Sequence, residues 1–118
     1  MGIAETGRLG EDHIVQYLLD RGCTILERNF HSRFGEIDII AQEGFFLLFV
    51  EVKTRDESSM THPFEAITPQ KQKKLVMTAG QYIVEHKPQL QPRFDAAAVF
   101  TRNGKIVGEK YLKNAFST

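Results

Sequence analysis

The sequence has little of several things that would point to particular classes of protein. Its 118 residues include one cysteine, Cys23, and no tryptophan, and 15 basic residues balance 15 acidic ones. A lone cysteine excludes an internal disulfide and argues against a thiolate zinc site, and the four histidines show no ligand spacing. The zero net charge argues against a protein that coats DNA, although it leaves room for a local basic rim.

Long apolar segments are also missing. The longest apolar run, residues 45–50, is too short to span a bilayer, and no charged-then-apolar leader opens the chain. We therefore expect a cytoplasmic protein that makes no membrane contact. Apolar residues make up 42% of the chain and charged residues 25%, which is ordinary for a globular protein. The length suits one domain over residues 1–118, with a frayed tail at Ser117-Thr118.

Residues 34–55 are the most informative stretch, because they predict two apolar strands that also carry charged residues. Side chains alternate along a strand, so Glu51 and Lys53 share one face of the second strand. Asp38 lies on the first strand. A turn at Glu43-Gly44 would pair the flanking residues and make Asp38 and Glu51 diagonal neighbours, roughly 7–8 Å apart on one face.

The simplest interpretation of these charges is an ion pair of Lys53 with Glu51 or Asp38 at the end of the sheet. The alternative is a divalent metal site, because buried charge without partners is costly. Mg²⁺ prefers carboxylate and carbonyl oxygens, and Asp38, Glu51 and the backbone carbonyl of Val52 would supply them. Lys53 could then orient a water molecule or steady the charge of a phosphate.

Residues 3–21 predict an amphipathic helix. Its apolar stripe consists of Ile14, Val15, Leu18 and Leu19. Glu11 lies on that stripe, either as a boundary glutamate whose carboxylate reaches water or as a third carboxylate of the site. Gly7 and Gly10 are unfavourable inside a helix, so they predict either the close approach of another backbone or a later helix start.

Thr68-Pro69 predicts the start of a second helix, with threonine as the N-cap and proline at the first helical position. Its apolar stripe consists of Leu75, Val76, Ala79 and Ile83. Lys71 continues this stripe inward, and Lys74 lies beside it in the first turns, where cations oppose the helix dipole. A bound phosphate would explain both lysines, and a solvated basic face is the alternative. Arg33 and Arg55 are further phosphate candidates with the same alternative.

The remaining segments predict strands at residues 23–30 and 93–101, and a hairpin turn at Asn103-Gly104. An edge strand at residues 105–112 would follow, with a frayed tail from Lys113 onward. Asp95 is interpreted as structural, paired with Arg93 or a neighbouring strand. The expected order is α-β-β-β-α-β-β, an α/β fold with a mixed sheet, in which the crossover through the second helix makes a parallel pair.

Two spaced motifs carry a resemblance to known proteins. GEID at residues 35–38, then twelve residues, then Glu51-Val52-Lys53, preceded by a helix bearing Glu11, resembles the PD-(D/E)XK nuclease superfamily. The proline of that name is absent, since Ile37 precedes Asp38. The chain is also similar to the YraN family of small bacterial proteins, which are related to archaeal Holliday junction resolvases. That similarity is carried by GRLGE (7–11), ERNF (27–30), FGEIDIIA (34–41), FVEVKTR (49–55), EAITPQKQKKL (65–75) and RFD (93–95).

The resemblance implies a restriction-endonuclease-like αβββαβ core, flanked by helices and followed by a C-terminal β-hairpin. It implies Asp38 and Glu51 as metal ligands and Lys53 as the catalytic lysine. Glu11 would complete the acidic set, through a water molecule or a second metal ion. Lys71 would contact phosphate or tune the site.

The expected function is Mg²⁺- or Mn²⁺-dependent hydrolysis of DNA phosphodiester bonds, with one or two ions and no small-molecule cofactor. Branched intermediates of recombination or repair are one expected substrate, and cutting a four-way junction symmetrically would require a homodimer. The alternative is a nucleic-acid-binding module that keeps the nuclease fold without turnover. A metal-free structural protein is the third interpretation, and it leaves the converging charges unexplained.

Overall fold

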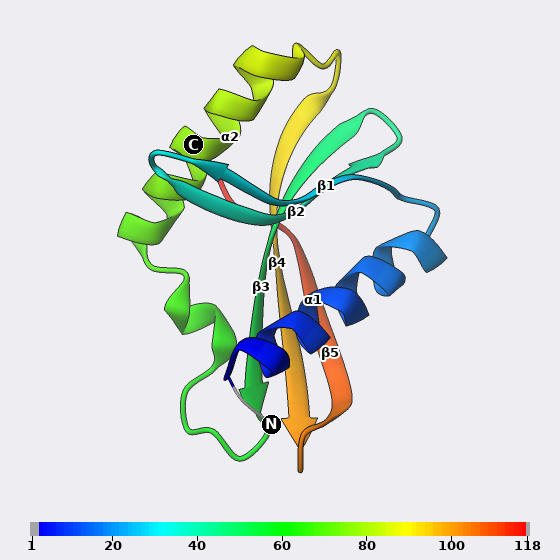
Figure 1. Ribbon diagram of the computed structural model, residues 1–118, viewed down its shortest axis with the longest axis vertical. Helices are drawn as coiled ribbons and strands as arrows, with labels where there is room; N and C mark the ends of the chain where they lie inside the picture. The colour runs from blue at the N-terminus through cyan, green and yellow to red at the C-terminus, as the bar shows by residue number, and fades with distance from the viewer. Residues whose placement is uncertain (1–2, 118) are drawn as a thin grey trace.

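The computed structural model describes residues 3–117, with side chains from residue 5 onward, and confirms the expected α/β order (Figure 1). The N-terminal helix is followed by three strands, a short 3-10 helix, a second helix and a final strand pair. The elements are α1 (Ile3–Asp20), β1 (Thr24–Ser32), β2 (Gly35–Glu43), β3 (Phe46–Asp56), η1 (Pro63–Ala66), α2 (Pro69–His86), β4 (Gln91–Arg102) and β5 (Lys105–Phe116). No helix among the described residues is long and apolar enough to cross a membrane.

The five strands form one mixed sheet in the order β1-β2-β3-β4-β5. Only β3 and β4 run parallel, because the chain crosses over through α2 between them, whereas the other neighbours are antiparallel. The predicted parallel pair is therefore confirmed. In Figure 1 the β1–β2 hairpin lies across the long strands β3 and β4, with the two helices on opposite sides of the view.

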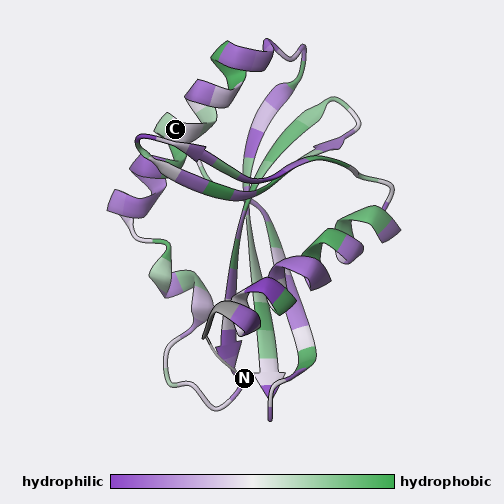
Figure 2. Cartoon of the chain, in the orientation of Figure 1, coloured by the Kyte–Doolittle hydropathy of each residue, from purple (hydrophilic) through white to green (hydrophobic). Residues whose placement is uncertain are grey.

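Apolar residues on the two faces of the sheet form two separate cores. Leu47 and Phe49 of β3 belong to the core beneath α2, and Leu48 and Val50 belong to the core beneath α1. Both faces of β3 are therefore covered, which explains its continuous apolar run. Full burial of one such side chain stabilises the fold by about 1.5–3 kcal/mol. Figure 2 shows that β3 becomes hydrophilic towards its arrowhead, where these cores end.

The register of the β2–β3 hairpin differs from the predicted one. Glu43 pairs with Phe46 and Ile39 with Val50, so the connecting turn is Gly44-Phe45 rather than Glu43-Gly44. Gly44 has a φ of 58°, a left-handed conformation that glycine adopts without steric cost. Moving the turn by one residue shifts the pairing by two. Asp38 and Glu51, the next residues beyond the last pair, therefore face each other directly rather than diagonally.

The last strand is longer than expected. β5 continues to Phe116, so the predicted frayed tail from Lys113 onward is wrong for all but its end. Two contacts hold this part of the strand: the Asn114 N–H donates to Asp95 Oδ1 at 2.9 Å, and the Phe116 ring stacks on Phe94. Ser117 lies beyond the strand, and Thr118 lies outside the described residues.

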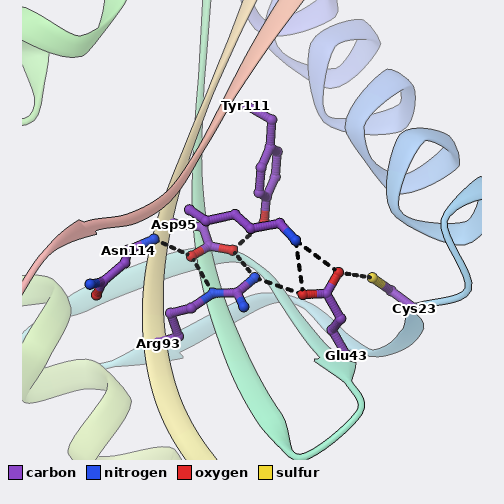
Figure 3. A network of polar contacts seen from close by, with 7 residues as sticks. Cys23, Glu43, Arg93, Asp95, Tyr111 and Asn114 are labelled. Atoms are coloured by element: carbon purple, nitrogen blue, oxygen red, sulfur yellow. Dashed lines mark hydrogen bonds and ion pairs between the residues drawn. The ribbon is translucent and has the colours of Figure 1, made fainter.

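Asp95 is the centre of a polar network that ties β4 to β2 and β5 (Figure 3). Its carboxylate is 0% exposed and accepts two hydrogen bonds from Arg93, both at 2.9 Å. The Tyr111 hydroxyl donates to it at 2.6 Å, and Arg93 also reaches Glu43 at 3.1 Å. The predicted structural pairing of Asp95 with Arg93 is therefore confirmed. Because the buried carboxylate has four donors, its burial does not leave an uncompensated charge.

Gly10 allows α1 to lie close to β3. A Cβ at this position would lie 1.9 Å from Thr54 Oγ1, whereas a Cβ at Gly7 would meet nothing within 4 Å. Of the two explanations for these glycines, close approach applies to Gly10. The later helix start is excluded for both, because α1 begins before them.

The Asp95 network yields a prediction about stability. Asp95→Ala should lower the free energy of unfolding by about 3–5 kcal/mol, because the Tyr111 hydroxyl and the Asn114 N–H would lose their acceptor and Arg93 would keep Glu43 as its remaining partner. Tyr111→Phe should cost only about 1 kcal/mol, since Arg93 and Asn114 still satisfy the carboxylate. Urea denaturation of both variants measures the difference. Equal losses of stability would contradict the prediction that the Asp95 carboxylate contributes more than the Tyr111 hydroxyl.

The helix contact yields a second prediction. Gly10→Ala should destabilise the protein by about 1–3 kcal/mol, because the new methyl group overlaps the Thr54 side chain. Gly7→Ala is the matched control, and it should stabilise the helix by up to about 1 kcal/mol. The double variant Gly10→Ala with Thr54→Ala should recover part of the lost stability, which thermal unfolding measures. No recovery in the double variant would show that the clash lies elsewhere.

Candidate functional site

The candidate site lies where β2 separates from β3. The two strands pair only as far as Ile39 and Val50, and beyond this point the Asp38 side chain replaces the backbone as partner of β3. Asp38 Oδ2 accepts the Val52 N–H at 2.7 Å. Ile37 belongs to the core beneath α2, whereas Ile39, two residues further along, belongs to the core beneath α1. The regular alternation of side chains along β2 is therefore interrupted at Asp38. The strand twist thus directs the Asp38 carboxylate towards β3.

Glu51 is the second carboxylate of the site. It is 3% exposed, and its Oε2 accepts no hydrogen bond from the described residues. Two ammonium groups lie near that oxygen: Lys71 Nζ at 3.1 Å and Lys53 Nζ at 3.9 Å. The Lys71 contact is thus an ion pair that lacks hydrogen-bond alignment. The predicted Lys53–Glu51 pairing is present, and α2 adds a lysine to it.

Burial and the neighbouring Glu51 shift the pKa of Asp38. Burial, with the hydrogen bonding and negative charge of Glu51, raises the pKa of Asp38 to about 8. The Val52 N–H and the Lys53 charge act in the opposite direction, but they do not offset burial. Asp38 therefore keeps its proton near neutral pH, because burial and the negative charge of Glu51 disfavour its ionised form.

Glu11 lies at the margin of this pair, on the inward side of α1. Its side chain is 19% exposed, and burial together with the charge of Asp38 raises its pKa. Arg28 Nη2 lies 3.7 Å from its carboxylate, and the Asn29 side chain also forms a hydrogen bond with it. Glu11 thus lies at the boundary between the site and solvent, and both interpretations of it stay open.

A cleft of about 930 Å³ opens beside the site. Glu11, Lys53 and Arg55 are among its lining residues, with the start of α1 and the β4–β5 turn completing its walls. Arg55 also donates to the Thr54 carbonyl. Of the site residues, Glu11 and Lys53 line this cleft, whereas Asp38, Glu51 and Lys71 do not.

The other predicted phosphate contacts lie on the α2 side. Lys74 is exposed on α2, and its Cβ lies 4.0 Å from the position that a Cβ at Gly35 would occupy, beside the β1–β2 turn. Arg33, in that turn, lies over the Phe34 ring. No carboxylate among the described residues pairs with Lys74 or Arg33. Both are therefore available to a phosphate, but no contact joins them to the carboxylate pair.

Sequence reasoning assigned Arg28 to a positive stretch next to the acidic cluster, but it did not predict the contacts of Arg28 and Asn29 with Glu11. Arg28 and Asn29 follow no spacing or periodicity that points towards α1. Asn29 has a φ of 53°, and the β1–β2 pairing shifts register between Ile25 and Glu27. The irregular strand directs these side chains towards α1. Asparagine tolerates a left-handed conformation, which is a signal, but a weak one.

The donor set permits a divalent cation without forming a complete cage. Among the described residues, no group of three His, Cys, Asp or Glu side chains converges as metal ligands. Mg²⁺ commonly needs only one or two carboxylates, because water and substrate phosphate supply its other ligands. Asp38 and Glu51 meet this requirement, and the unbonded, buried Oε2 of Glu51 offers a lone pair.

Comparison with known proteins places this site inside a family match. A model described as "Uncharacterised protein family UPF0102" matches residues 10–99. This range includes the five residues of the site, which are Glu11, Asp38, Glu51, Lys53 and Lys71. A UPF0102 protein of Dictyoglomus thermophilum is 43% identical over 98% of this chain and 100% of its own length. One of Chlorobium phaeobacteroides is 42% identical over 97% and 95%, and one of Clostridioides difficile 38% over 98% and 100%.

The carboxylate pair predicts how stability depends on pH. Folding raises the pKa of Asp38 from 3.8 to about 8, so the folded protein retains a proton that the unfolded chain releases. The wild-type free energy of unfolding should therefore fall as pH rises through this window. Asp38→Asn cannot ionise, so its stability relative to wild type should increase by more than about 1 kcal/mol between about pH 5 and pH 8.

Urea denaturation in metal-free buffer measures this difference, with Asp20→Asn as the control. Asp20 is exposed and bonds only to Gln16, so its substitution should leave the pH profile unchanged. A stability difference between Asp38→Asn and wild type that stays constant with pH would contradict the shifted pKa.

Proposed function

The chain belongs to the UPF0102 family, and on that premise we propose that it is a metal-dependent nuclease acting on DNA. The observation that carries this proposal is the convergence of two buried carboxylates, Asp38 and Glu51, with Lys71 and Lys53 beside them. Lys53 also lines the neighbouring cleft. Protein architecture alone does not require two facing buried carboxylates. Hydrolysis of a phosphodiester bond uses this donor set.

Asp38 and Glu51 would hold a divalent cation, with the Val52 carbonyl as a further oxygen donor. When bound, Mg²⁺ or Mn²⁺ would act as a Lewis acid on the scissile phosphodiester. The Val52 N–H fixes the Asp38 carboxylate, so its free oxygen keeps a constant direction. Lys53, whose side chain is 27% exposed, reaches both the carboxylates and the solvent. It is suited to orient the attacking water molecule or to stabilise charge on a phosphoryl oxygen.

Glu11 would support the site from α1. Its side chain lines the cleft, and Arg28, which hydrogen-bonds to Asp12, lies 3.7 Å from the Glu11 carboxylate, so Glu11 could bind a water molecule of the metal shell or a second cation. The family resemblance is compatible with either role. Glu11 therefore belongs to the proposed acidic set as a partner of Asp38 and Glu51 rather than as a primary ligand.

Two observations support DNA as the substrate class. Lys53 and Lys71 place positive charge next to Glu51, and Arg55 adds another cation to the cleft, although the chain as a whole carries no net charge. The motif order Asp38…Glu51-Val52-Lys53 on an αβββαβ scaffold supports assignment to the PD-(D/E)XK superfamily. Branched DNA and a homodimer that cuts it symmetrically are parts of the proposal that rest on the resemblance alone.

The test is cleavage of labelled duplex, single-stranded and four-way-junction DNA in Mg²⁺ and in Mn²⁺. Wild type should cut at least one substrate, and EDTA should abolish cleavage. Glu51→Gln should reduce the rate by more than about 10³-fold and Lys53→Met by about 10²–10³-fold, because each removes a group that acts on the reacting phosphate. Glu85→Gln, an exposed carboxylate variant on α2, is the control and should cut at the wild-type rate.

The alternative, binding without turnover, predicts a different pattern. The wild type would bind a branched substrate and leave it intact in both metals, and Glu51→Gln would bind it equally well. Cleavage that survives Glu51→Gln would also contradict the proposal, because the activity would then come from another site or a contaminant.

A further inference from the structure

Lys71 lies where it competes with a metal ion for Glu51. Its Nζ is 3.1 Å from Glu51 Oε2, which is the closest charged contact of that oxygen. Glu51 itself is 3% exposed, so water cannot replace this contact. The oxygen that a cation would use is therefore already neutralised by a side chain of the protein.

The two partners differ in mobility. The Lys71 side chain is 34% exposed and has a flexible four-carbon stem, whereas the backbone of Lys71 is fixed by the N-cap. The Lys71 N–H donates to Thr68 Oγ1 at 3.2 Å, so the start of α2 stays in place wherever the ammonium group points. Lys71 can consequently leave Glu51 by side-chain rotation alone, but Glu51 cannot follow it into solvent.

We propose that Lys71 is a displaceable counter-ion, which neutralises Glu51 in the metal-free protein and leaves it when a divalent cation binds between Glu51 and Asp38. This inference rests on the metal site of the proposed function, and it adds that the Lys71 ammonium group and the cation compete for Glu51. Lys53 Nζ already lies 3.9 Å from this oxygen, so a divalent cation bound there would strongly repel the second ammonium group, that of Lys71, at 3.1 Å. The released ammonium group then becomes available to the substrate phosphate, so metal binding prepares a second phosphate contact.

The competition predicts that removing the Lys71 charge strengthens metal binding. In Lys71→Met, the Mn²⁺ dissociation constant should fall by about tenfold, because the cation no longer displaces an ammonium group. Lys71→Arg keeps the charge and should stay near the wild-type value. Lys73→Met, an exposed substitution two residues along α2, is the matched control for the loss of a positive charge on the same helix and should change the constant by less than about twofold.

Free Mn²⁺, followed by electron paramagnetic resonance, measures these constants on the full chain without DNA and independently of activity. Circular dichroism checks that each variant is folded, and Lys71→Gln replaces Lys71→Met should the latter unfold. The variant Lys71→Met with Glu51→Gln should show no gain over Glu51→Gln alone, because the competition requires the Glu51 carboxylate.

The outcomes separate this inference from the proposed function. Tighter Mn²⁺ binding by Lys71→Met than by wild type supports the competition, including a case in which only the variant binds at measurable strength. Mn²⁺ binding that is equal or weaker in Lys71→Met overturns the counter-ion role but leaves the metal site standing. Absence of Mn²⁺ binding in both proteins overturns the metal site and the inference together.

Discussion

Two carboxylates facing each other inside a sheet impose the main constraint on this structure. Asp38 and Glu51 cannot both be ionised at low cost in a buried position, so everything around them supplies protons, cations or donors. The Val52 N–H donates a hydrogen bond to Asp38. Lys71 of α2 and Lys53 of β3 place their ammonium groups near Glu51. The interruption of β2–β3 pairing also follows, because the Asp38 side chain occupies a backbone position.

Asp95 and Glu51 are buried carboxylates on neighbouring strands, one residue apart in register, yet their partners differ. Asp95 is held by an arginine, a tyrosine and a backbone N–H, which leave it fully bonded. Glu51, also buried, has an oxygen with no hydrogen bond from the described residues. Such incomplete satisfaction is uncommon away from functional sites. Asp95 is therefore a structural group, whereas Glu51 holds a cation only within the function proposed above.

Local patterns in the sequence predicted the elements, because turn and capping residues are short-range signals. Thr68-Pro69 marked the start of α2 correctly, and the spaced motifs identified the family. The register of β2 and β3 was not predictable in the same way, since Gly44 could serve in either of two adjacent turns. The contact between Lys71 and Glu51 depends on how α2 crosses the sheet, which no local pattern encodes. Lys71 was therefore predicted as an inward lysine, but its partner was not.

The parallel pairing of β3 with β4 imposes an order on the folding of this chain. Asp38 and Glu51 meet within a local hairpin, whereas β4 can join β3 only after the intervening loop and α2 have been placed. Local contacts generally form at lower entropic cost than distant ones. We expect the two acidic groups to approach each other before α2 delivers its lysine, so nascent chains pass through a stage of local charge repulsion. Protonation or an early cation would ease that stage, which links the chemistry of the finished site to the ease with which the chain reaches it.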